Sequence, residues 1–171
     1  GRIKKRTKEI VSLNLIILNM KKKIVAGNWK MNLDFQEAQD LVESIANLCE
    51  EKQPDCDIII CPPFPYLELT TDMADETQAF YVGAQNVNEN ESGAFTGEVS
   101  AKMLDSLGTN FCIVGHSERR SYFKESDEEI NAKVKKALEK GLTPILCFGE
   151  TLEERNNNLA YSVVEKQLHG A

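Results

Sequence analysis

The residues best suited to chemistry lie near the middle of the chain, in the segment FCIVGHSERR at positions 111–120. The segment begins with four apolar residues, a pattern typical of a strand buried on both faces of a parallel sheet. Ionisable side chains, among them His116 and Glu118, follow directly after Gly115. Enzymes built on parallel sheets place catalytic groups at this carboxyl end of a strand. Two interpretations of His116 stay open here: a catalytic imidazole, or a structural histidine that satisfies backbone groups under a loop.

A second candidate is Lys30, which lies in the segment GNWKMN directly after a short predicted strand at positions 23–26. A lysine that follows a strand is most often a solvated charge. Here it lies between Trp29 and Met31 at the end of the first predicted strand. A buried ammonium at that place would meet an anionic substrate. The pattern therefore favours an anion site, with a solvated charge as the alternative.

Five motifs follow one another along the chain: GNWKMN (27–32), AQN (84–86), GAFTGE (93–98), VGHSERR (114–120) and PILCFGE (144–150). In order and spacing, from about Met20 onward, they closely resemble the triosephosphate isomerase family. One such motif is weak support, whereas five in sequence are strong. The resemblance implies an α/β fold of the (β/α)8 TIM-barrel type. It also implies an aldose–ketose isomerase of glycolysis and gluconeogenesis, which interconverts dihydroxyacetone phosphate and glyceraldehyde 3-phosphate through an enediolate, without a cofactor.

The resemblance assigns roles to residues at the matching positions. His116 matches the electrophile that polarises the substrate carbonyl, and the helical turn that can begin at Ser117 has N–H groups that disfavour an imidazolium. Lys30 matches the lysine that offsets the charge of the substrate phosphate and of the enediolate. Asn28 matches an asparagine that positions the substrate. Glu118 matches an acidic residue beside them, and two roles stay open for it: a direct catalytic one, or a carboxylate at a helix N-terminus that orders the loop.

The polar block at positions 85–98 is too long for a simple turn between a strand and a helix. It resembles the loop that inserts into the partner subunit of a homodimer, with Gln85 and Glu98 at its ends and Thr96 reaching the neighbour's site. Arg119 matches an arginine on the interface side. A solvated surface loop explains any one of these residues, but explains the whole block poorly.

The predicted elements alternate between strands and helices, which indicates a parallel sheet with right-handed crossovers. Helix starts are marked by three capping boxes, at Asp34 with Glu37, Ser126 with Glu129, and Thr151 with Glu154. Gly141 is predicted to be a left-handed helix stop, and Gly108 to end a helix that carries Val99, Met103, Leu104 and Leu107. Strands are predicted to begin at Lys23, Asp57, Phe80, Asn110 and Thr143.

Five strand–helix units are fewer than the eight that close such a barrel, and the 171 residues are fewer than the usual length of about 250. We therefore expect two open sheet edges and an uncovered inner face, onto which alternate apolar residues of the strands (Ile58, Ile60, Ile113 and Ile145 among the candidates) must point. The family's catalytic glutamate follows the sixth strand and its phosphate loops follow the seventh and eighth. The acidic residues of the fifth unit (Glu150, Glu153, Glu154 and Glu165) do not match that glutamate.

The chain alone is accordingly expected to be catalytically silent. Two explanations stay open: the N-terminal part of an ordinary isomerase, or a natural inactive fragment or binding partner that acts through the dimer loop. A different phosphosugar enzyme on the same fold is a third, because fold alone does not fix function.

Composition and charge argue against several other classes of protein. The net charge is −7, although residues 1–19 carry five Lys/Arg and one acidic residue. We expect these 19 residues to be a basic extension, disordered or not native, ahead of a partial barrel at residues 20–171. A body this acidic is a poor partner for nucleic acid. The apolar run in the extension is too short for a membrane span, and no signal-peptide cleavage site follows it. The five cysteines have neither metal nor disulfide spacing, which indicates a cytoplasmic protein without a metal and Cys147 in a packing role.

Overall fold

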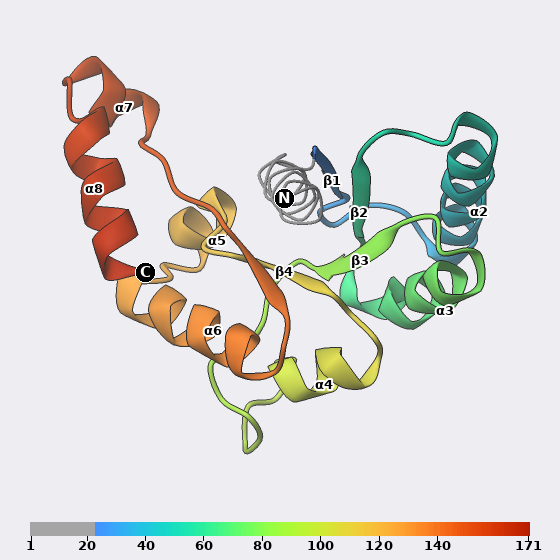
Figure 1. Ribbon diagram of the computed structural model, residues 1–171. Coiled ribbons are helices and arrows are strands. Elements are labelled where there is room, and N and C mark those ends of the chain that lie inside the picture. The colour runs from blue at the N-terminus through green and yellow to red at the C-terminus, as the bar shows by residue number, and fades with distance from the viewer. Residues whose placement is uncertain (1–22) are drawn as a thin grey trace, which may run out of the picture.

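The structure, a computed structural model, describes residues 23–171, so the predicted boundary at Met20 lies outside the described residues (Figure 1). Five parallel strands form one sheet in the order of the sequence. Each strand begins at its predicted first residue or one residue later. The strands are β1 (Ile24–Asn28), β2 (Asp57–Cys61), β3 (Tyr81–Ala84), β4 (Phe111–Val114) and β5 (Thr143–Leu146).

Helices connect the strands and lie around the outside of the curved sheet (Figure 1). A strand order without a reversal is that of a singly wound barrel, whereas a doubly wound sheet reverses its order in the middle. The helices are α2 (Phe35–Lys52), the short 3-10 helix η1 (Phe64–Tyr66), α3 (Leu67–Thr77), α4 (Ala101–Ser106), α5 (Ser117–Tyr122), α6 (Asp127–Glu139), α7 (Leu152–Asn156) and α8 (Ala160–Gly170). The predicted α/β fold of incomplete barrel type is confirmed.

Local sequence signals account for several helix ends. All three predicted capping boxes form, at the starts of α2, α6 and α7. Gly141 has a φ of 79°, the left-handed conformation predicted for it. The prediction for α4 was too long, because the Ser100 side chain accepts a hydrogen bond from the Met103 N–H and starts the helix there. Val99 therefore precedes α4, and Leu107 is its C-cap residue.

The main core lies between the outer face of the sheet and the helices. Side chains at alternate strand positions (Ile60, Val82 and Val114) are at most 2% exposed and belong to one cluster with Val42 of α2 and Ile130 of α6. Burial of this kind stabilises a protein by about 1.5–3 kcal/mol for each large side chain. Ile58 packs against the same cluster, so Ile58 and Ile60 face the helices.

The inner face is less bare than predicted. Ile113 and Ile145 belong to a second, smaller cluster with Ile59 and Cys61, and the centres of β2 and β4 are well covered: Ile59 is 1% exposed and Ile113 5%. The physical reason is Gly83 of β3, where an added Cβ would lie 2.7 Å from the Cys61 Sγ. Neighbouring side chains close over this glycine and bury one another. The expectation of an uncovered inner face is therefore wrong at the centre of the sheet.

Exposure remains at the edge of the sheet. Among residues 23–171, β1 and β5 each have only one neighbouring strand, as predicted. Ile24 and Val25 of β1 are 56% and 59% exposed. A sixth strand beside β5 and an eighth beside β1 are what a closed barrel places at these edges.

Candidate active site

The predicted site residues gather at the carboxyl ends of three strands. Asn28 is the last residue of β1, and Lys30 lies two residues beyond it. Gln85 directly follows β3, and His116 follows β4 after Gly115. Gly115 has a φ of 73°, and an added Cβ would lie 3.1 Å from the Cys147 carbonyl oxygen. A glycine is thus needed for the chain to turn out of β4 and present His116.

Lys30 is held in a left-handed backbone conformation, with a φ of 58°. This conformation costs a non-glycine residue roughly 1–2 kcal/mol. Side-chain amides bind both polar groups of its backbone. The Lys30 N–H donates to the Asn28 Oδ1 at 2.9 Å, and the Gln85 Nε2 donates to the Lys30 carbonyl oxygen at 2.9 Å. The turn after β1 is therefore fixed by residues of two different βα units.

The Lys30 ammonium makes an ion pair with Glu118, with 2.5 Å between Nζ and Oε1. The two side chains are 52% and 42% exposed, so the predicted buried ammonium is wrong. Its place at the open carboxyl ends of the strands explains the exposure. The hydrogen bond from Lys30 is the main cause that holds the pKa of Glu118 below its usual range. The carboxylate therefore stays ionised beside the imidazole of His116.

His116 is the N-cap residue of α5, and its orientation follows from that position. Its Nδ1 accepts a hydrogen bond from the Glu118 N–H at 3.2 Å. A ring nitrogen that accepts carries no proton, so this geometry corresponds to a neutral imidazole with its proton on Nε2. The Glu118 Oε2 lies 3.6 Å from Nδ1, which is beyond hydrogen-bond distance and does not compete with the N–H donor. Within residues 23–171 no hydrogen bond occupies Nε2, so its N–H is available as a donor for a ligand oxygen.

Behind the site lies a buried ionic network that sequence reasoning missed. Glu125 accepts hydrogen bonds from the Arg119 Nε and the Lys133 Nζ, each at 2.5 Å. The Lys133 Nζ also donates to the Asn86 Oδ1 at 3.2 Å. Burial raises the pKa of Glu125, and the hydrogen bonds from Lys133 and Arg119 outweigh burial, so that its pKa lies below the usual range. The network joins α6 to the ends of β3 and α5.

The predicted dimer loop at positions 85–98 is only partly connected to Lys30, Glu118 and His116. Gln85 bonds Lys30, whereas Glu98 accepts from the Asn88 Nδ2 at 3.0 Å within the loop. Thr96 is exposed, and no hydrogen bond or ion pair within residues 23–171 joins it to Lys30 or His116. Arg119 is occupied inside the chain, by Glu125 and by the ring of Phe123, whose centroid lies 4.5 Å from the guanidinium carbon.

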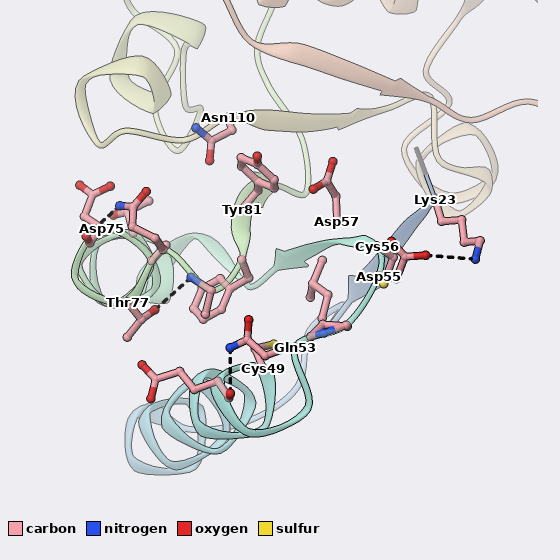
Figure 2. Close-up of a pocket in the computed structure, with 18 of the residues that line it drawn as sticks. Lys23, Cys49, Gln53, Asp55, Cys56, Asp57, Asp75, Thr77, Tyr81 and Asn110 are labelled. Atoms are coloured by element: carbon pink, nitrogen blue, oxygen red, sulfur yellow. Dashed lines mark hydrogen bonds and ion pairs between the residues drawn. The ribbon is translucent and has the colours of Figure 1, made fainter. Parts of the chain in front are cut away.

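A cleft lies at the opposite, amino-terminal ends of the strands (Figure 2). It has a volume of about 860 Å³ and contains none of the predicted site residues. Gln53 and Gln78, the C-cap residues of α2 and α3, line it together with Cys49 and Cys56. Within the described part of the chain, no group of three or more His, Cys, Asp or Glu residues is arranged to hold a metal. No helix between residues 23 and 171 is long and apolar enough to span a bilayer.

Consecutive parallel βα units with polar side chains at their carboxyl ends define a βα-barrel protein, here with five of the eight units. The family model for triosephosphate isomerase matches residues 23–171. The chain therefore belongs to the triosephosphate isomerase family.

Relatives and solved structures agree with this assignment. The chain is 50% identical over 149 residues to a triosephosphate isomerase of Bacteroides fragilis, and 47% identical over 152 residues to one of Alkaliphilus oremlandii. These matches cover 87% and 89% of the chain, and 59% and 60% of the two relatives. A crystal structure of triosephosphate isomerase from Bartonella henselae superimposes with a TM-score of 0.81 and 36% identity, over 88% of this chain and 61% of that one. The chain thus spans about 60% of the length of the curated relatives it matches.

Proposed function

We propose that this chain supplies the electrophilic half of a triosephosphate isomerase active site. The observation that carries the proposal is the Lys30–Glu118–His116 constellation, in which a lysine and a neutral histidine from different βα units face one carboxylate. The substrate is proposed to be dihydroxyacetone phosphate or glyceraldehyde 3-phosphate, and the reaction a proton transfer between adjacent carbons.

Each residue of the constellation has a task in this reaction. The His116 Nε2–H donates a hydrogen bond to the substrate carbonyl oxygen and stabilises it as it becomes an enediolate oxygen. Donors of this kind contribute about 3 kcal/mol or more, because they stabilise charge that develops in the transition state. The Lys30 ammonium offsets the charge of the phosphate and of the enediolate. Asn28 has its Oδ1 occupied by the Lys30 N–H, so its Nδ2 is the part left to orient the substrate.

The proton itself needs a base, and the family resemblance assigns that role to a glutamate after the sixth strand. Glu150, the acidic residue nearest to the end of β5, is poorly suited. A hydrogen bond from its own backbone amide and the pair with Arg155 hold its pKa below the usual range, and a low pKa makes a weak base. Glu118 is likewise paired with Lys30. Activity is therefore proposed for the assembled barrel, with this chain inactive by itself.

A homodimer is proposed for the assembled protein, with the loop at 85–98 inserted into a second copy. Two features support it: the 46% exposure of Phe95 near the tip, and the internal bond between Asn88 and Glu98 that shapes the loop. Phe95→Asp and Thr96→Arg should each turn the dimer into a monomer in sedimentation velocity runs. A dimer that survives both substitutions would leave the loop as an ordinary surface loop.

The test of the function uses a chimera in which this chain continues into the part of the Bacteroides fragilis relative that follows its matched region. Calorimetry should show that dihydroxyacetone phosphate binds to the chimera. Lys30→Met, a neutral side chain of similar length, should abolish this binding, whereas Lys136→Met should leave it unchanged. Lys136 is a suitable control, since it forms a surface pair with Glu139 on α6. If Lys30→Met binds the substrate with unchanged affinity, Lys30 is a solvated charge and the proposed role fails.

A further inference from the structure

The Gln85 side chain joins two carbonyl groups that belong to neighbouring βα units. Its Nε2 donates to the Lys30 carbonyl oxygen and to the Cys61 carbonyl oxygen, each at 2.9 Å. The Cys61 carbonyl also accepts a hydrogen bond from the Trp29 N–H at 3.1 Å. The Trp29 N–H is therefore bound directly to Cys61, the last residue of β2, and the Lys30 carbonyl is linked to the same residue through Gln85.

Only a donor of the right length suits this position. A glutamine amide offers two N–H donors on one nitrogen, and both are used here. A glutamate of the same shape offers only acceptors, which would face two carbonyl oxygens, and a methionine offers no donor. The start of the Gln85 side chain is itself fixed, because the next residue, Asn86, is 6% exposed and receives a hydrogen bond from the buried Lys133.

Release of the Lys30 carbonyl would let the backbone leave its left-handed conformation. The Lys30 φ of 58° is one that lysine rarely adopts unless neighbouring groups hold it. A rotation of this backbone carries the Cα–Cβ bond with it, and so moves the ammonium away from the Glu118 carboxylate 2.5 Å away. The site would then lose the geometry in which lysine and histidine face the same ligand.

We propose that Gln85 is a positioning residue, which holds Lys30 in its left-handed conformation and thereby places the ammonium beside Glu118 and a bound phosphate ester. This role deepens the proposed function and rests on it for the identity of the ligand. Gln85 touches no reacting atom. Its effect passes through Lys30.

The test uses the full 171-residue chain and the titration of the Glu118 carboxyl group, followed by carbon-13 NMR. Lys30→Met gives the midpoint of a Glu118 without its partner, which should be higher than that of the parent chain. Gln85→Met should move the Glu118 midpoint at least halfway from the parent value to the Lys30→Met value. Gln78→Met is the matched control, since its Nε2 donates to the Asp75 carbonyl oxygen at 2.9 Å at the far end of the sheet. It should leave the Glu118 midpoint where it is.

A folded Gln85→Met chain with the parent midpoint would overturn the proposal. If Gln85→Met does not fold, the unmutated chain decides by hydrogen exchange of side-chain amides. The Gln85 amide protons bond two carbonyls and should exchange several times more slowly than those of Gln53 and Gln78, which bond one carbonyl each. Equal exchange rates would also overturn the proposal.

The same variants separate this role from the proposed function. In the chimera, Gln85→Met should weaken dihydroxyacetone phosphate binding about five- to tenfold, the effect of one lost hydrogen bond on a binding constant. Suppose that Gln85→Met moves the Glu118 midpoint, but that the chimera without substitutions binds no dihydroxyacetone phosphate. This pair of results would support the positioning role and contradict the isomerase assignment.

Discussion

The two ends of the same five strands differ in how their polar side chains are held. At the carboxyl ends, side chains bind residues of other βα units: the Gln85 amide binds the Lys30 carbonyl oxygen, the Lys30 ammonium binds Glu118, and the Lys133 ammonium binds Asn86. At the amino ends, the Gln53 side chain binds a carbonyl group of its own helix (Figure 2). The Gln78 side chain does the same in α3.

The cleft and the connected polar side chains therefore lie at different ends of the sheet. The amino ends hold a cleft of about 860 Å³, yet the helix-end glutamines that line it cap the helices that carry them. The carboxyl ends hold their polar groups in fixed relative positions. Catalysis depends on such fixed positions, because preorganised charges do not have to be rearranged during the reaction. In this molecule the network of contacts identifies the site, and the size of the cavity does not.

The strongest contrast between the two ends is expected in stability. Glu125→Gln leaves Lys133 buried without a counter-charge, and loss of one partner of a buried pair costs about 3–5 kcal/mol. Asp55→Asn removes the partner of Lys23 at the amino ends, where the two groups are 3.7 Å apart and largely exposed. That change should cost less than about 1 kcal/mol. Urea denaturation at neutral pH measures both, and equal losses would contradict the contrast.

The pH dependence of stability should also report on the Glu125 network. Because the folded-state pKa of Glu125 lies below its usual range, its contribution to stability is present above the unfolded value of about 4.3. The contribution is lost as the pH falls from there through the lower folded value. Unfolding free energies measured between pH 6 and pH 3 should therefore fall more steeply for the parent chain than for Glu125→Gln. Parallel curves would mean that Glu125 is not the group responsible.

A smaller effect is expected where the inner face closes. Gly83→Ala places a Cβ 2.7 Å from the Cys61 Sγ, and overpacking of this kind costs about 1–3 kcal/mol. Gly27→Ala on the edge strand β1 is the matched control, since its Cβ would have no atom nearer than 4.0 Å. Thermal unfolding should show a lower midpoint for Gly83→Ala alone. Two equal midpoints would mean that the inner cluster is loosely packed.

The smallest effect is expected in the reactivity of the cysteine thiols. Burial raises the pKa of both Cys61 and Cys112 to about 12, while Cys56 is half-buried beside the cleft at the amino ends. At pH 8 a thiol with such a pKa is about one part in ten thousand thiolate, the form that reacts. Brief iodoacetamide treatment followed by mass spectrometry should modify Cys56 first and leave Cys61 and Cys112 intact. Early modification of Cys112 would show that β4 opens readily.

Much of the fold was predictable, because it depends on local signals. The three capping boxes lie within four residues each, and they define the starts of α2, α6 and α7. Strand starts follow from short apolar runs. The prediction for α4 failed because its apolar residues extend beyond both ends of the helix, while Ser100 fixes its start.

The contacts of the site were less predictable, because they join residues far apart in sequence. The motif AQN pointed to Gln85, but its bond to Lys30 spans 55 positions. Lys133 was missed altogether. Its place between Ile130 and Ala137 on the buried face of α6 was the available signal, since a lysine on an apolar stripe needs a buried partner. The sequence alone could not show that Glu125 and Asn86 meet it there.

The central claim is that His116 acts as the electrophile of a triosephosphate isomerase, and one measurement tests it most directly. The turnover number of the chimera for dihydroxyacetone phosphate is measured in a coupled assay, with and without His116→Gln, and circular dichroism confirms that both proteins are folded. The loss of one donor to a developing oxyanion predicts a fall in kcat of about 10²- to 10³-fold. A folded His116→Gln chimera with near-normal turnover would contradict the account and make His116 a structural histidine.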